Sequence, residues 1–254
     1  MKILLFFCAT VLLAQPVQPP GLVQGQLSHV SRKQLPGKLS QLIDLSSDRF
    51  DQRGKERVQM LASVRQLTPA RSINVRLSQQ WREGLRVDNL SDNSSFTYTG
   101  TGLALSKGTA DARDLGVAEI FAHDSVEGLM DQFANGSRIR LVGQNVRVQD
   151  PRARNPLGGA CDLYEIEDTS RLRGNQVRSL KTFCFDPVTG QLRSVVYRTG
   201  ADHIETRYEQ WQTLQNQPFP RLITRIENDN RTLEITITAA TVLAAAQDNL
   251  FRIQ

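Results

Sequence analysis

Regular alternation of apolar and polar residues begins near residue 72 and recurs, with one helical interruption, almost to the C-terminus. Ile73, Val75 and Leu77 alternate with polar neighbours, and residues 232–238 repeat the pattern late in the chain. A period of two residues is typical of a β-strand that buries one face. The succession of such strands predicts an antiparallel meander. The predicted strands are residues 72–78, 85–88, 96–98, 103–105, 138–149, 160–167, 178–186, 191–198, 203–211, 220–227 and 232–238.

Two helices are expected beside these strands. Residues 36–47 carry Leu39, Leu42 and Ile43 at helical spacing, with Pro36 near the start. The clearer helix lies within residues 123–136, where the i, i+3, i+4, i+7 stripe consists of Val126, Leu129, Met130 and Phe133.

The ends of this second helix have their own signals. Asp124 with Glu127 three residues later matches a capping box, and Gly136 can end the helix in the left-handed conformation. The segment 55–67 is undecided between strand and helix, because its apolar residues fit both periods. A change of phase at Gly143 indicates a β-bulge in the strand after the helix.

The N-terminus has the three parts of a secretory signal, namely Lys2, an apolar segment over residues 3–13 and the small residue Ala14. The apolar segment is shorter than the roughly 20 residues that span a bilayer. Cys8 lies inside this segment, which is the wrong place for a lipid-modified mature N-terminus. We therefore expect a periplasmic or secreted protein that is soluble and not lipid-anchored, with an uncleaved N-terminal anchor as the alternative.

These signals divide the chain into three parts. Residues 1–14 are the expected signal peptide, and residues 15–34 are a Pro- and Gln-rich flexible linker. Residues 35–254 are expected to form a single domain.

The two cysteines that follow the predicted signal are Cys161 and Cys184. If the protein is exported, they lie in an oxidising compartment, where disulfides form and persist. The turn-like residues 171–175 lie midway between Cys161 and Cys184, so two strands folding back there would place the cysteines directly opposite each other. A disulfide closing a loop of this length would stabilise the fold by roughly 3 kcal/mol. A redox-active pair is the alternative, but such pairs usually have C-x-x-C spacing. The sequence therefore predicts a structural disulfide.

The stretch CFDPVTGQLRSVVYR, which begins at Cys184, predicts a hairpin. Asp186 starts a turn that Gly190 can complete with positive φ. Phe183 and Phe185 flank Cys184, so both faces of the first strand carry residues that prefer burial. This pattern predicts a central strand.

The charge pattern argues against a nucleic-acid partner. The formal net charge of +5 comes from 31 Lys and Arg against 26 Asp and Glu, without a long basic run. Sites for nucleic acids combine a basic face with stacking aromatic residues, and no aromatic residues interleave with the local cluster of arginines. We interpret that cluster as solvated strand faces, with weak attraction to anionic lipid headgroups as the alternative. The cluster consists of Arg138, Arg140, Arg147, Arg152 and Arg154.

No motif points to catalysis or to a cofactor. His123, Asp124 and Ser125 are consecutive, and consecutive side chains diverge around a helix start instead of lining up as a triad. Asp124 or Ser125 as an N-cap explains these residues better. The histidines after the signal, His29, His123 and His203, have no metal-binding spacing, and no P-loop, G-x-S-x-G or dinucleotide motif is present. We therefore expect no catalytic residues, no metal and no cofactor.

Two groups of polar residues carry weaker catalytic hypotheses. His203 and Glu205 share one face of a strand and are interpreted as a solvated charge cluster rather than as a general acid–base pair. A hydrolase would need a pair of carboxylates, and the available candidates are Asp150, Asp162, Glu165 and Glu167.

The elements together predict an α+β fold built on one large, strongly curved antiparallel β-sheet, with amphipathic helices covering its concave face. Where helices and sheet do not fill the space between them, an apolar cavity for a greasy ligand remains. The alternative is that the helical stripe is plain core. The candidate ligand-binding residues, in the cavity or its lid, are Val126, Leu129, Met130, Phe133, Phe96 and Tyr208.

The C-terminal third resembles the second half of the LolA/LolB-type lipoprotein-carrier superfamily. The shared features are an Asp-x-x-Thr-Gly hairpin, a Tyr-x-x-Trp strand, a Phe-Pro pair and an alternating last strand; they fall on Asp186, Thr189, Gly190, Tyr208, Trp211, Phe219, Pro220, Leu233, Ile235 and Ile237. The resemblance implies an incomplete β-barrel with helices as a lid over an apolar cavity that carries acyl chains through the periplasm. The chain departs from the family in its cysteine pair, its long linker and its more polar strands, and no ligand-contacting residue of the family aligns with a numbered position.

Two functional hypotheses of different kinds follow. The first is a non-enzymatic carrier or binding protein that shields a lipid, an acyl chain or a lipoprotein anchor and meets a membrane-associated donor or acceptor protein as a monomer. The second is a structural or protein-interaction module of the cell envelope, with the same sheet and a filled core. An apolar cavity with a movable lid distinguishes the first from the second.

Overall fold

The computed structural model describes residues 28–29, 56–80, 84–99, 102–106, 111–134, 138–147, 160–168, 179–214, 217–244 and 250–251. The predicted signal peptide lies outside these residues, and so do the helix expected at 36–47 and nearly all of the linker. Those three interpretations therefore stay predictions.

The described chain consists of thirteen strands and two helices. The strands of the first half are β1 (Ser28–His29), β2 (Glu56–Leu67), β3 (Ala70–Gln80), β4 (Gly84–Asn89), β5 (Ser95–Thr99) and β6 (Gly102–Leu105). The helices α2 (Ala112–Ala122) and α3 (Val126–Ala134) follow. The strands of the second half are β7 (Arg138–Arg147), β8 (Ala160–Asp168), β9 (Ser179–Phe185), β10 (Leu192–Thr199), β11 (Asp202–Leu214), β12 (Gln217–Glu227) and β13 (Asn230–Ala244).

All described strands belong to one antiparallel sheet, in the order β1-β7-β8-β9-β10-β11-β12-β13-β2-β3-β4-β5-β6. The pairing of β13 with β2 joins the second half of the chain to the first, and the sheet is open because β1 and β6 are its two edges. The predicted antiparallel meander is therefore confirmed. The segment left undecided at 55–67 is a strand, because as β2 it lies between β3 and β13 and needs the extended conformation to pair with both.

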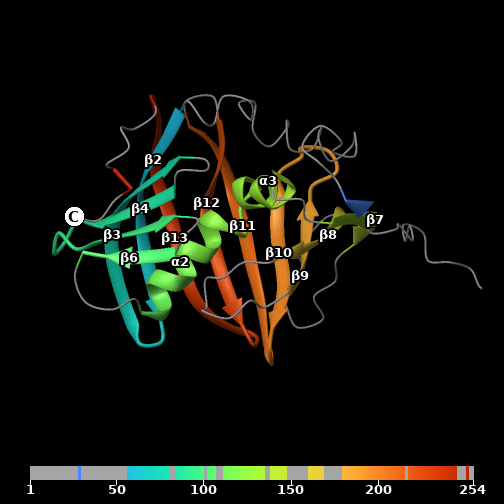
Figure 1. The fold of residues 1–254 in the computed structure, drawn as a ribbon, viewed down its shortest axis with the longest axis horizontal. Helices are drawn as coiled ribbons and strands as arrows, with labels where there is room; N and C mark the ends of the chain where they lie inside the picture. The colour runs from blue at the N-terminus through green and yellow to red at the C-terminus, as the bar shows by residue number, and fades with distance from the viewer. Residues whose placement is uncertain are drawn as a thin grey trace, which may run out of the picture.

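The two helices connect opposite sides of this sheet. The chain leaves β6 at one edge, forms α2 and α3, and enters β7 beside the other edge. Figure 1 shows both helices lying across the middle of the sheet. At the crossing, α2 comes close to the sheet, since a Cβ added at Gly116 would lie 3.5 Å from Leu233 of β13 and 3.7 Å from Arg225 of β12.

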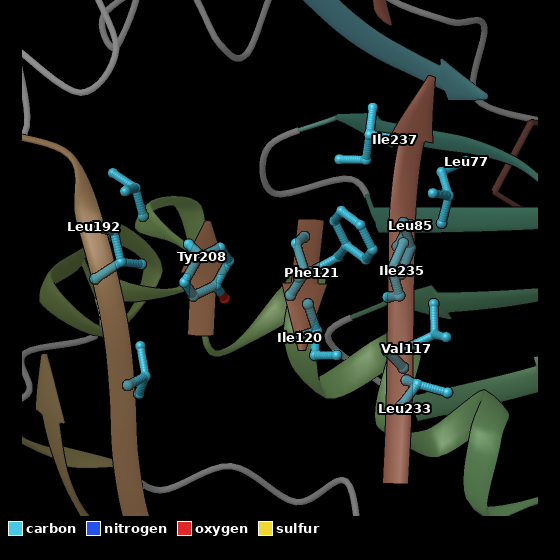
Figure 2. Close-up of a cluster of buried hydrophobic side chains, with 14 of the residues drawn as sticks. Leu77, Leu85, Val117, Ile120, Phe121, Leu192, Tyr208, Leu233, Ile235 and Ile237 are labelled. Carbon is cyan, nitrogen blue, oxygen red and sulfur yellow. The ribbon is translucent and has the colours of Figure 1, made fainter. Parts of the chain in front are cut away.

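The core lies between these helices and the face of the sheet that they cross. Val117, Ile120 and Phe121 of α2 are at most 5% exposed and belong to one buried cluster with Leu233 and Ile235 of β13. Figure 2 shows these side chains grouped together, with Tyr208 and Leu192 farther along the same cluster. Burial of this apolar surface is the main stabilising contribution to the fold.

Helix α2 is absent from the sequence-based prediction, which recognised α3 but not α2 between the strands. Its N-terminus has the cap that marks such helices: the side chain of Asp111 accepts from the backbone N–H of Asp114, and the Asp114 carboxylate accepts from the backbone N–H of Asp111. Its apolar residues do not form a narrow stripe, and the helical period is therefore weak in the sequence.

The predicted capping box of Asp124 and Glu127 is wrong, whereas Ser125, the other expected N-cap residue, is confirmed. Helix α3 begins at Val126, and the hydroxyl of Ser125 accepts from the backbone N–H of Gly128 at 3.1 Å. Ser125 is therefore the N-cap residue. Asp124 points into the sheet instead, because cations and hydroxyl groups of three strands surround its carboxylate.

Cys161 and Cys184 form the predicted disulfide, with their Cα atoms 5.3 Å apart. The register differs from the expected one, because Leu163, not Cys161, lies directly opposite Cys184. The shift is two residues, which keeps both cysteines on the same face of the sheet, so the disulfide joins β8 and β9 diagonally. The phase change at Gly143 is also confirmed, since the pairing of β7 with β8 shifts on both sides of that residue.

The hairpin between β9 and β10 has the predicted turn. Gly190 has a φ of 71°, and its N–H donates to the Asp186 carbonyl at 2.9 Å. The Asp186 carboxylate accepts from the N–H groups of Val188 and Thr189 at 2.8 and 2.9 Å and forms an ion pair with Arg193. Burial alone would raise the pKa of Asp186, but these two hydrogen bonds and the Arg193 guanidinium lower it below the ordinary value.

We expect the substitution Asp186→Ala to lower the free energy of unfolding by about 1–3 kcal/mol at pH 7, because two backbone donors and one cation lose their acceptor. A carboxyl group with a lowered native pKa stabilises the fold above its unfolded-state pKa of about 3.9, and this contribution is lost as the pH falls through the native value. Urea unfolding of both proteins between pH 7 and 3 measures the effect. The difference between them should shrink below about pH 4, and a constant difference would contradict the assignment.

Candidate functional site

A cavity of about 320 Å³ lies between the N-terminal end of α2 and strands β3 to β6. Its floor is apolar and comes from inward-facing positions of paired strands: Ile73, Val75, Val87, Phe96 and Leu105. Phe96 lies opposite Leu105 and also opposite Val87, so these three side chains form a continuous surface across β4, β5 and β6. Alternation within each strand directs these side chains to the same face of the sheet.

The cavity opens toward the first residues of β3. Along this strand Val75 is fully buried, Ile73 is half-buried and Arg71 is exposed, and all three line the cavity. The cavity therefore has an apolar interior and a charged mouth. Its remaining lining is polar and comes from the β4–β5 turn and the start of α2: Asn89, Asp92, Ser94, Ser95, Asp111, Arg113 and Asp114.

The predicted ligand-binding residues are distributed over three locations. Phe96 lines the cavity. Val126, Leu129 and Tyr208 are buried in the main core, with exposed fractions of 8%, 0% and 6%. Met130 and Phe133 lie on α3, and their side chains are outside the described part of the structure.

A second notable feature is a charge cluster buried under the junction of α2 and α3. Asp124 connects the two helices and is 0% exposed. The Lys181 ammonium of β9 donates to its Oδ1 at 2.7 Å, and the Thr206 hydroxyl of β11 donates to its Oδ2 at 2.9 Å. The Tyr208 hydroxyl donates to the backbone carbonyl of Asp124 at 2.8 Å. These hydrogen bonds attach the helix junction to strands β9 and β11 of the sheet.

Arg225 of β12 completes the charge cluster. Its guanidinium, which is 1% exposed, pairs with Glu119 of α2 and Glu227 of β12, and lies 3.6 Å from Asp124. Burial alone would lower the pKa of Arg225, but its interactions with Tyr197, Glu119 and Asp124 raise it above the ordinary value. Arg225 therefore stays charged although it is buried among apolar residues.

The tyrosines beside the charge cluster serve as neutral hydrogen-bond donors. Burial, and next the Asp124 carboxylate, raise the pKa of both Tyr197 and Tyr208 above the ordinary value. The Lys181 ammonium also lies 4.5 Å from the centre of the Tyr197 ring, a distance typical of a cation–π contact. Asp124, Thr206, Arg225 and Lys181 are at most 3% exposed, and their arrangement supports positioning of the helices.

The weaker catalytic hypotheses gain no geometric support. Glu165 forms an ion pair with Arg140 across β7 and β8, and Asp162 accepts from the backbone N–H of Asn145 at 2.9 Å. Asp150 lies outside the described residues. Within the described part of the chain, no group of three or more His, Cys, Asp and Glu side chains is arranged to hold a metal ion.

The face of β11 that carries His203 and Glu205 is more covered than predicted. Glu205 pairs with Arg207 of the same strand at 2.7 Å, and both side chains are only 12% exposed. The interpretation as a solvated cluster is therefore wrong for Glu205.

Among the described helices, neither is long and apolar enough to cross a membrane.

Solved structures share this architecture at very low sequence identity. A LolA superfamily protein from Nitrosomonas europaea superposes with a TM-score of 0.50 over 84% of this chain and 97% of its own, at 8% identity. This chain has a LolA-type fold. The resemblance predicted from the C-terminal third is therefore confirmed at the level of the fold, and the superposition extends it to most of the chain.

Two further solved structures are similar. A putative outer-membrane lipoprotein-sorting protein domain from Vibrio parahaemolyticus has a TM-score of 0.48, 10% identity and coverage of 84% of this chain and 97% of its own. A DUF1329 family protein from Desulfovibrio piger has a TM-score of 0.49, 10% identity and coverage of 86% and 100%. No family model matches the sequence, and no curated protein matches it either.

Several residues of the cavity and the charge cluster were not recognised from the sequence, although a signal existed for each. Arg225 shares a strand face with Ile223, and Lys181 shares one with Phe183, so alternation places both cations inward. Arg113 follows Asp111, whose capping signal marks the start of α2. In each case, the sequence indicates where the cation lies but not which charged group it pairs with.

The substitution Lys181→Met should lower the free energy of unfolding by about 3–5 kcal/mol, because it removes one partner of a buried ion pair. The double variant Lys181→Met/Asp124→Asn should lose less free energy of unfolding than the sum of the losses in the two single variants, since both changes remove the same interaction. Arg65→Met is the control, because Arg65 is 61% exposed and pairs with Glu234 at 3.5 Å; it should cost less than about 1 kcal/mol. Denaturant unfolding measures all four variants, and a Lys181→Met protein as stable as the control would contradict the role of the charge cluster.

Proposed function

We propose that this protein is an exported, non-enzymatic carrier or binding protein that shields a lipid acyl chain in a cavity between its sheet and its helices. The observation that carries the proposal is the cavity of about 320 Å³ with a floor of five apolar side chains. Ligand pockets of proteins occupy about 300–1,000 Å³ and are mostly apolar with a few polar groups. The volume of the cavity lies at the lower end of this range, and its floor is apolar, whereas the rest of its lining is polar.

The size of the cavity limits what it holds in this conformation. It suits one hydrocarbon chain, or part of one, rather than a lipoprotein anchor with several chains. Larger cargo requires α2 and α3 to move away from the sheet, and in our proposal these helices form the lid over its concave face. The buried charge cluster, with Lys181 and Arg225 on the sheet and Asp124 at the helix junction, is then the contact that opening must break.

The proposal agrees with the fold likeness and with the sequence resemblance to the LolA/LolB-type superfamily, which implies transport of acyl chains through the periplasm. The exported location rests on the signal predicted for residues 1–14. A membrane-associated donor or acceptor protein is the expected partner of such a carrier, and we expect the carrier to act as a monomer.

One observation favours the second hypothesis, a structural or protein-interaction module of the envelope. The middle of the face that the helices cross is filled, since Ile120, Leu129 and Ile235 are each at most 1% exposed. A protein with this core and no cargo would bind its partners through its surface and would hold no ligand in its interior. The two hypotheses therefore differ in whether hydrocarbon enters the cavity beside β3 to β6.

Purification of the chain from residue 15 onward without detergent, followed by solvent extraction and mass spectrometry, tests the proposal. We expect bound lipid at close to one molecule per protein. An acyl ligand that binds the cavity should stabilise the fold by about 2.7 kcal/mol when its free concentration is 100 times its dissociation constant. This stabilisation corresponds to a rise of roughly 5–10 °C in the melting temperature of a domain of this size.

The variant Leu105→Trp narrows the cavity and should reduce bound lipid several-fold while the fold is kept. Leu61→Trp is the matched control, because Leu61 is 41% exposed and does not line the cavity. Clean extracts together with an unmoved melting temperature would reject the carrier and favour the interaction module.

A further inference from the structure

The face of the sheet that is turned away from the helices carries an excess of arginine on the neighbouring strands β13, β2, β3 and β4. In β2, Ala62 and Val64 are buried in the core, so alternation turns Ser63 and Arg65 to the opposite, outer face. On these four strands the described residues place five arginines but only two carboxylates on the outer face. They are Arg57, Arg65, Arg76, Arg86, Arg231, Asp88 and Glu234. We call this surface the arginine face.

The two carboxylates of the arginine face are half-buried and paired. Glu234 is 21% exposed and lies 3.5 Å from both Arg65 and Arg231, so one carboxylate is shared by two cations. Asp88 is 27% exposed and pairs within its own strand. Arg65 and Arg231 are 61% and 64% exposed, and Arg76 is exposed as well. Among the described residues of this face, the charges that meet solvent are therefore cations, and the surface potential is positive.

The residues between the exposed arginines are short and uncharged. Ser63 pairs in register with Asn74 of β3 and with Thr236 of β13, and Ser72 lies opposite Arg65. Because arginine is much longer than these neighbours, its guanidinium group extends beyond them. The arginine face thus offers several guanidinium groups, spread over three adjacent strands, to whatever approaches it.

The type and spread of the cations indicate the kind of partner. A guanidinium group binds phosphate oxygens with two parallel hydrogen bonds, and all the cations of this face are arginines. An acidic protein would have to match the positions of the arginines with fixed carboxylates. Lipids diffuse within a bilayer and can bring a phosphate to each guanidinium, so an anionic membrane needs no such match.

We propose that the arginine face docks this protein on bilayers that contain anionic phospholipids, with Arg65, Arg76 and Arg231 bound to lipid phosphates. The inference goes beyond the proposed function and does not depend on it, because the apolar floor of the cavity belongs to the other face of the sheet. A molecule docked in this way keeps α2 and α3 turned away from the membrane, since they cross that other face (Figure 1). A partner protein can then reach the helices while the membrane holds the sheet.

Co-sedimentation of the chain from residue 15 onward with lipid vesicles tests the inference. The probes are vesicles of phosphatidylcholine alone and vesicles in which about 30% of the lipid is phosphatidylglycerol, which gives the surface a negative potential. Each exposed arginine near such a surface should raise the partition coefficient about fivefold, and three should raise it about 100-fold over that of the neutral vesicles. NaCl at about 0.5 M, where the Debye length is about 4 Å, should remove most of the binding.

The triple variant Arg65→Gln/Arg76→Gln/Arg231→Gln keeps polar side chains but removes three charges from the arginine face. Its partition coefficient on anionic vesicles should fall about 100-fold, to the value for neutral vesicles. All three residues are exposed, so the fold should be kept, and circular dichroism verifies this.

The matched control is the triple variant Arg147→Gln/Arg198→Gln/Arg221→Gln. It loses the same net charge from exposed arginines of β7, β10 and β12, outside the arginine face. Its partition coefficient on anionic vesicles should fall less than about fivefold, because these residues are not bound to the lipid phosphates.

Every outcome decides the inference. Binding to anionic vesicles that the first variant loses and the control keeps supports the docking face. Equal losses in both variants would show that net charge alone attracts the protein, and would overturn it. Absence of binding to anionic vesicles, or equal binding to both kinds of vesicle, also overturns it and leaves the arginines to an acidic protein partner. The carrier function is tested separately, since the three substituted arginines of this face do not line the cavity.

Discussion

The carboxylate of Asp124 is the single group on which the arrangement of helices and sheet depends. The segment with α2 and α3 must run from one edge strand to the opposite side of an open sheet, and apolar contacts alone specify its position only loosely. The carboxylate of Asp124 is completely buried at the helix junction and has lost its hydration. This cost is offset only where Lys181, Thr206 and Arg225 surround the carboxylate. A displacement of the helices would separate the Asp124 carboxylate from Lys181 and Arg225, although Arg225 would still pair with Glu227 of its own strand. The charge cluster therefore selects one position for the crossing segment.

This choice affects where a ligand can bind. Over β9 to β13, the described side chains of the charge cluster and of α2 are buried and packed against the sheet. The cavity described above lies farther along the sheet, where α2 begins and where β3 to β6 supply the floor. Three polar residues of β9, β11 and β12, namely Lys181, Thr206 and Arg225, thus have a structural use, because they hold the helix junction in place through Asp124.

Sequence periodicity predicted the sheet well because alternation is a local property of each strand. The same local rule places Lys181 and Arg225 inward beside Phe183 and Ile223, yet it does not say which charge on a distant element each one meets. Helix α2 escaped prediction because residues 115–121 are apolar or small at nearly every position except Glu119, which hides the helical period. The register of the disulfide was missed for a related reason, since a shift of two residues leaves every side chain on its predicted face.

The start of α2 links stability of the fold to the chemistry of the cavity. Asp111 and Asp114 cap the helix, Asp114 orients Arg113, and all three residues line the cavity, so the same few contacts fix the helix end and the polar wall. A movement of α2 that enlarged the cavity would therefore also disturb these contacts. In the proposed carrier, a ligand would be held while the helices are in place and released when α2 moves, without any change in the floor of the cavity.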